Sequence, residues 1–211
     1  RVELLGEGGV DADTSALSSA RWPQDGSSQT LGIRDDMGKL TVVLVPFRYD
    51  YDGTGRMPDL SEAQMQRYDD AVRAIYPAAD FEILIHPETQ AWTSRVDWFD
   101  FNARLRDLKA ATPGSEEHYY YVLISPAEDF VEYCVGTCTT GQSYTVSNAS
   151  AKSYRVGTGM GWGGERWTWT MVHELGHMHG RGHARCGVSF FSQDRSYPYS
   201  VSYTHLRAHE T

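Results

Sequence analysis

The segment 173–183 restricts the structure of this chain more than any other part of it. It reads His-Glu-Leu-Gly-His-Met-His-Gly-Arg-Gly-His. Residues four apart lie on one face of an α-helix, so a helix here places the imidazoles of His173 and His177 side by side. Two histidines at this spacing can bind one zinc ion. The segment therefore predicts a helix that carries two metal ligands on one face.

Gly180 indicates how a third ligand reaches the same ion. A helix that continued through this position would carry His183 away from the other two imidazoles. Glycine adopts the left-handed conformation that ends a helix, so we expect the chain to turn at Gly180 and His183 to close the site. Three neutral imidazoles leave one coordination position of zinc open, which is typical of a catalytic site.

Glu174 lies beside the expected ligands and can act as a general base toward a water molecule. A purely structural zinc site would not need this carboxylate, so its presence favours catalysis. His179 also falls inside the segment, but we expect it off the ligand face, either at the surface or supporting the ligands from behind.

The full pattern, HExxHxxGxxH, resembles the signature of the metzincin clan of zinc metallopeptidases. From LTVVLVPFRYDYDGTGRMPDLS to MVHELGHMHGRGHARCG, about residues 40–200, the chain is similar to secreted bacterial StcE-like mucin-degrading enzymes. The resemblance implies an α+β fold, with a twisted mixed β-sheet, packed helices and an active-site helix. It also implies zinc ligands at His173, His177 and His183, a catalytic base at Glu174, and action outside the cell, in some members on heavily glycosylated proteins.

One feature of the clan is missing. Metzincins place a methionine turn beneath the zinc, downstream of the third histidine. Here no methionine follows His183, so we expect the lower, Met-turn subdomain to be missing or replaced. The tail 201–211 (VSYTHLRAHET) resembles translated adapter sequence and is expected to be non-native. The methionines are Met37, Met57, Met65, Met160, Met171 and Met178.

The domain organisation follows from these patterns. Residues 1–38 are rich in glycine, serine and aspartate and are expected to form a linker or the edge of a preceding domain. Residues 39–200 are expected to form the metallopeptidase catalytic domain, incomplete at its C-terminus. Cys186 is expected to have lost a partner with the missing part.

Strands and helices alternate along the expected domain, which favours a partly parallel sheet. The stretch 126–153 reads as loops, and Ser61 with Gln64 reads as a capping box at the start of a helix. The expected strands are 40–47, 81–86, 119–125 and 154–160, and the expected helices are 61–76 and 97–111.

Two smaller motifs leave alternatives open. Cys134 and Cys138 are close enough to form a disulfide within one loop, which would indicate an oxidising compartment; the alternative is two reduced cysteines. Asp50, Asp52, Thr54 and Gly55 echo the first half of a calcium loop, but its twelfth position would be a serine instead of a glutamate. A glycine-rich turn is the favoured interpretation there.

A third motif, Gly159, Gly161 and Gly164, spells GxGxxG before a helix. A dinucleotide site needs an acidic residue about 20 positions later, where the histidine segment lies instead. We therefore expect these glycines to let a loop pass close to the cleft.

The composition and charge of the chain exclude some kinds of binding partner. The net charge of -9 and the lack of a lysine or arginine cluster exclude an ordinary nucleic-acid binder. No apolar run approaches the ~20 residues that span a bilayer.

We expect a secreted zinc endopeptidase acting on protein or glycoprotein substrates, with an oligomeric state that the sequence does not determine. The alternative is a zinc-containing adhesion module that binds glycoprotein without cutting it, since Trp162, Trp167 and Trp169 can stack on sugars or pack in the core. A third possibility is a structural zinc domain with no open coordination position.

Overall fold

The structure is a computed structural model, and it describes residues 39–76, 78 and 80–183. The expected linker 1–38, the tail 201–211, Cys186 and the part of the expected domain beyond His183 lie outside these residues. The boundaries assigned to them from the sequence stay predictions.

The described part of the chain has an α+β fold with a mixed six-stranded sheet and four α-helices, as the sequence predicted at that level. The long elements match the expected ranges to within a few residues. In chain order they are β1 (Leu40–Tyr49), α1 (Glu62–Ile75), β2 (Phe81–Ile85), β3 (Gln90–Trp92), α2 (Trp98–Ala111), β4 (Tyr119–Ile124), α3 (Phe130–Tyr133), β5 (Gly141–Ser143), the 3-10 helix η2 (Lys152–Tyr154), β6 (Val156–Met160) and α4 (Glu165–Met178).

The sheet has the strand order β2-β1-β4-β6-β5, and β3 pairs with the end of β1. β1, β2, β3, β4 and β6 run parallel, whereas β5 at the edge runs antiparallel to β6. The sequence predicted a partly parallel sheet with strands at the positions of β1, β2, β4 and β6, but it did not predict β3. It also did not predict β5, which lies in the stretch 126–153 that reads as loops.

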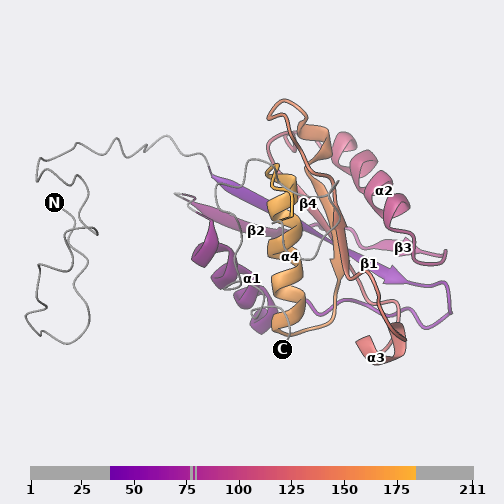
Figure 1. The fold of residues 1–211 in the computed structure, drawn as a ribbon. Helices are drawn as coiled ribbons and strands as arrows, with labels where there is room; N and C mark the ends of the chain where they lie inside the picture. Colours follow the sequence, from indigo (N-terminus) through magenta and orange to yellow (C-terminus); the bar gives the residue numbers. More distant parts are fainter. Residues whose placement is uncertain (1–38, 77, 79, 184–211) are drawn as a thin grey trace, which may run out of the picture. The chain divides into compact units, whose positions relative to one another are not determined.

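Helices cover both faces of the sheet (Figure 1). Val42 and Leu44 of β1 share one core with α1 and α4, while Val43 and Val45 share another with α2. Successive side chains of a strand point to opposite faces, so both faces of β1 are buried. This explains why β1 reads as a continuous apolar run instead of an alternating one.

Gln64 joins α1 to the start of α4. Its backbone N–H donates to the hydroxyl oxygen of Ser61, as a cap requires, but its side chain turns away from its own helix. The side-chain amide donates to Thr168 Oγ1 at 2.9 Å and accepts from Gly164 N at 2.7 Å. The expected capping box is therefore only half correct. Ser61 caps the backbone of Gln64, but the Gln64 side chain does not bond back to Ser61, because it hydrogen-bonds to α4 in a buried contact.

The glycines of β6 make room beneath α4. A Cβ atom at Gly159 would lie 1.9 Å from Tyr121 Oη, and one at Gly157 would lie 3.3 Å from Met178 Cε. The ring of Tyr121, which is fully buried, therefore crosses β6 only because these positions lack side chains. Gly159 lies within β6, which agrees with the strand expected over 154–160 and contradicts the expectation that this glycine belongs to a loop near the cleft.

Replacing Gly159 by alanine should test this close packing. We expect Gly159→Ala to lower the free energy of unfolding by about 1–3 kcal/mol, because the added methyl group overlaps the Tyr121 hydroxyl. That hydroxyl has no hydrogen-bond partner among the described residues. Tyr121→Phe should therefore cost little alone and should recover part of the loss in the double variant. Urea unfolding measures all three; an unchanged midpoint in Gly159→Ala would contradict the packing.

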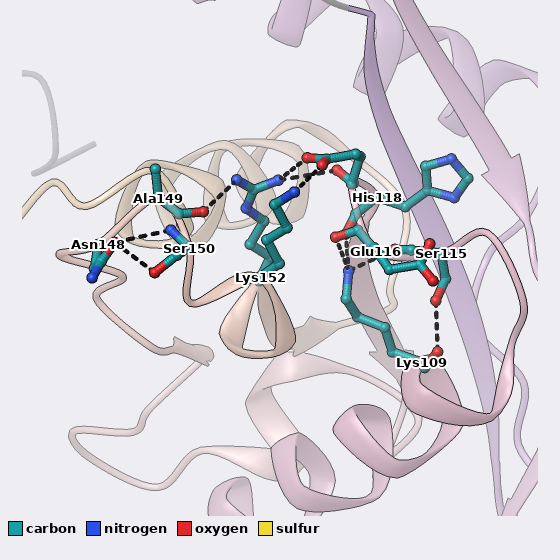
Figure 2. A network of polar contacts seen from close by, with 10 residues as sticks. Lys109, Ser115, Glu116, His118, Asn148, Ala149, Ser150 and Lys152 are labelled. Carbon is teal, nitrogen blue, oxygen red and sulfur yellow. Dashed lines mark hydrogen bonds and ion pairs between the residues drawn. The ribbon is translucent and has the colours of Figure 1, made fainter.

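A buried lysine organises the connection from α2 to β4 (Figure 2). Lys109 is 3% exposed, and its ammonium donates to the carbonyl groups of Ser115, Glu116 and His118. Burial lowers the pKa of Lys109 to about 8. Three donors on the ammonium match three acceptors, so the contact fixes the turn that leads into β4.

The lowered pKa of Lys109 predicts a pH-dependent stability. Between about pH 8 and pH 10.5, the unfolded chain holds a proton that the folded protein has released, so this residue makes the free energy of unfolding rise with pH. Below about pH 8 both states are protonated and the slope vanishes. Lys109→Met should lose this slope. If the free energies of unfolding of the wild type and of Lys109→Met changed equally with pH between 7 and 10, the lowered pKa of Lys109 would be refuted.

Candidate metal centre

Three histidines meet at the C-terminal part of α4. The Nε2 atom of His177 lies 3.1 Å from Nε2 of both His173 and His183, and the other two Nε2 atoms lie 3.2 Å apart. His173 and His177 are one helical turn apart, as the sequence predicted. Within the described ranges, these three residues form the one group of side chains that could hold a metal ion.

The spacing of the three nitrogen atoms fits a zinc ion. Zinc–nitrogen bonds of about 2.0–2.1 Å at tetrahedral angles place ligand nitrogens ~3.3 Å apart. The observed separations of 3.1–3.2 Å are close to this value. A fourth position on such an ion would face away from the three imidazoles. The donor set of neutral nitrogen ligands also suits zinc.

Gly180 turns the chain so that His183 returns to the helix. It has a φ of 85°, and its N–H donates to the carbonyl of His177 at 2.8 Å. The next residue, Arg181, donates from its N–H to Gly176 O at 3.0 Å. A Cβ atom at Gly180 would lie 2.7 Å from Val146 O, so both the backbone conformation and the space require glycine.

The same turn fixes the tautomer of one ligand. Nδ1 of His177 lies 2.5 Å from the carbonyl oxygen of Arg181, which can only accept a hydrogen bond. The proton of His177 is therefore on Nδ1, and the lone pair on Nε2 faces the other imidazoles. This is the usual way in which a backbone carbonyl orients a metal-binding histidine.

The side chain of Glu174 extends from α4 toward the edge strand β5. Its side chain is 5% exposed, and Ser143 Oγ donates to Oε2 at 2.6 Å. Burial raises the pKa of the Glu174 carboxyl, while the Ser143 hydrogen bond and nearby His177 oppose this rise. Ser143 was not identified from the sequence, because the contact joins residues far apart in a stretch that lacks strand periodicity.

His179 does not join the cluster, in agreement with the sequence. Its Nδ1 lies 2.7 Å from Leu175 O, and its ring stacks on Tyr119 at a centroid distance of 4.4 Å. Tyr76 contacts the other side at 5.1 Å. Desolvation of the ring by its neighbours lowers the pKa of His179, although the residue as a whole is exposed. The residue thus packs the end of α4 against α1 and β4.

A cavity of about 590 Å³ borders the cluster. His173, His177 and His179 line one part of it, and the remaining lining residues are Ile75, Tyr76, Val172, Gly176, Arg181 and Gly182. The imidazoles therefore face a space large enough for a side chain of a bound molecule. The apolar part of the lining comes from the end of α1 and from α4.

Cys134 and Cys138 form a disulfide, which confirms the pairing considered from the sequence. It closes the loop between α3 and β5, three residues before Gly141. Tyr133 Oη also donates to Thr139 O at 3.1 Å within this loop. The disulfide is compatible with an extracellular protein.

The region of the weak calcium motif forms a turn. Asp50 accepts from the guanidinium of Arg48, and Asp52 pairs with Arg56 and accepts from Thr54. Both carboxylates therefore already have cationic partners. The geometry agrees with the glycine-rich turn and lends no support to calcium.

Packing accounts for two of the three tryptophans considered for sugar binding. The rings of Trp162 and Trp167 lie 4.9 Å apart, and Phe130 contacts Trp167 at 5.5 Å. Trp169 is 47% exposed on α4. Only Trp169 therefore presents a large part of its ring to the surface.

No protein-family model matches this chain, and a search of curated protein sequences finds no significant match. The similarity to metzincins therefore rests on the sequence motif. Among the described residues, no helix combines the length and apolar character needed to cross a bilayer.

Metal analysis should test the histidine cluster. We expect about one zinc ion per chain in the purified protein. Loss of a residue that only supports a ligand costs about 10–100-fold in affinity, so His177→Ala should weaken zinc binding by more than ~100-fold. The matched control is His86→Ala, because His86 follows β2 at the opposite edge of the sheet. Equal zinc content in the two variants would contradict the site.

Proposed function

We propose that this chain is a zinc-dependent endopeptidase that hydrolyses peptide bonds of protein or glycoprotein substrates outside the cell. The observation that carries the proposal is the convergence of three histidine Nε2 atoms, two from α4 and one from the turn after it, beside the buried carboxylate of Glu174 on the same helix. The metzincin-like pattern and the cavity beside the cluster support the same function.

His173, His177 and His183 would hold the metal through Nε2. Bound zinc would supply a Lewis acid that lowers the pKa of water and stabilises negative charge on the scissile carbonyl. No other group in the described site offers both charge stabilisation and nucleophile activation. The orientation of His177 by the Arg181 carbonyl keeps its lone pair directed at the cluster.

Glu174 would transfer the protons of the reaction. Its carboxylate takes a proton from the attacking water and delivers it to the nitrogen of the departing amine, whose bond to the carbonyl carbon breaks. A carboxyl group whose pKa is raised by burial is better suited to hold that proton between the two transfers.

The cavity would accept part of the substrate. Ile75, Tyr76 and Val172 give it an apolar wall, and Arg181 adds a cationic residue to the lining. A substrate residue with apolar character therefore fits this space best. Extracellular action is supported by the Cys134–Cys138 disulfide.

Substitution of Glu174 separates catalysis from binding. We expect Glu174→Gln to reduce cleavage of casein and mucin by about 10²–10⁴-fold, because general base catalysis contributes about that much. Zinc content should stay near one per chain. Glu165→Gln at the start of the same helix is the control and should leave both properties unchanged.

Two results would contradict the proposal. Cleavage that persists in Glu174→Gln would remove this residue from the reaction. Binding of mucin by the zinc-loaded wild-type protein without any cleavage would favour the non-catalytic glycoprotein-binding module instead.

A further inference from the structure

The edge strand β5 presents two residues to Glu174. Positions 141 and 143 of a strand point to the same face, and here that face is covered by α4. Ser143 Oγ lies 2.6 Å from Glu174 Oε2 and 3.0 Å from the backbone oxygen of the same residue. The serine hydroxyl therefore contacts both the side chain and the main chain of Glu174.

Gly141 leaves the space that the carboxylate occupies. A Cβ atom at this position would lie 2.8 Å from Glu174 Oε1, 3.0 Å from its Cγ and 2.7 Å from Thr170 Cγ2. A side chain at 141 would therefore push the carboxylate away from β5. One strand thus provides both a donor to one carboxylate oxygen and room for the other.

The position of β5 is itself fixed. Gly141 pairs with Gly159 and Ser143 pairs with Gly157 of β6. The disulfide between Cys134 and Cys138 closes the loop that ends three residues before the first residue of the strand. Ser143 is consequently a donor on a rigid element, which is what precise placement of a reacting group requires.

We propose that Ser143 is a positioning residue whose hydroxyl holds the Glu174 carboxylate beside the histidine cluster. This role rests on the proposed endopeptidase function, and it acts through Glu174 without contact to substrate. A hydrogen bond to a carboxylate is stronger than one between neutral groups, so loss of the hydroxyl releases the side chain to other rotamers.

The second contact of the hydroxyl extends this role. Ser143 Oγ lies 3.0 Å from the backbone oxygen of Glu174 as well as 2.6 Å from its Oε2. The hydroxyl therefore links the edge strand to α4 at the residue whose side chain it orients.

Two substitutions of equal shape isolate the hydroxyl. Ser143→Thr keeps the hydroxyl and adds a methyl group, whereas Ser143→Val replaces the hydroxyl with a second methyl group. With zinc-loaded protein and casein as the substrate, we expect Ser143→Val to lower kcat by about 10–100-fold, the range seen for residues that support a metal site. KM should change little, zinc should stay near one per chain, and Ser143→Thr should retain most of kcat.

A second measurement is independent of catalysis. The midpoint of urea unfolding of the zinc-free protein should fall in Ser143→Val, and this fall should largely disappear when Glu174 is already alanine, because the two residues share one contact. Gly141→Ala should lower kcat as Ser143→Val does, through displacement of the same carboxylate.

The outcomes distinguish the two proposals. Equal kcat values in the Thr and Val variants, in an active wild-type protein, would overturn the role of Ser143 and leave the endopeptidase proposal standing. A wild-type protein that cleaves nothing would overturn the endopeptidase function, and the positioning role with it. In that case the unfolding measurements still test the contact between Ser143 and Glu174. If the effects of Ser143→Val and Glu174→Ala on the unfolding midpoint were additive, the hydroxyl would not hold Glu174.

Discussion

The close approach of α4 to the edge of the sheet is the constraint on which the rest of the site depends. Gly141 and Gly157 lack the side chains that would push the helix outward. The space they leave is filled by Glu174 and by Met178 of the helix. Strand glycines weaken a sheet unless another group packs closely against them, and here that group is the helix that carries the candidate ligands.

Most long elements could be predicted from the sequence because apolar runs and caps determine them locally. β1 and α1 agree with their expected ranges to within two residues, and Asp97 caps α2 as its expected start requires. The short elements β3, α3 and β5 could not be predicted, since three or four residues carry no periodicity. The neighbouring strands β1 and β6 supply the hydrogen bonds of β3 and β5, and α3 begins at Asp129, which accepts a hydrogen bond from Glu132 N.

The residues of the candidate site also differ in whether local sequence determines them. The histidines and the turn at Gly180 could be predicted, since their spacing alone places them on one helix and its return. Ser143 and the side chain of Gln64 could not, because each acts through a contact with a segment far away in the chain. The sequence pattern predicted that the Gln64 side chain would cap its own helix. In the structure it instead hydrogen-bonds to Gly164 and Thr168 at the start of α4.

The contact between Gln64 and Gly164 spans a sequence separation of 100 residues. Such long-range contacts form late, because closing a long loop costs chain entropy that only the final packing repays. The helix bearing His173 and His177 is therefore anchored only once α1 has docked. Metal uptake by the histidine cluster would therefore report on whether α1 has docked against α4, and not on the local helix alone.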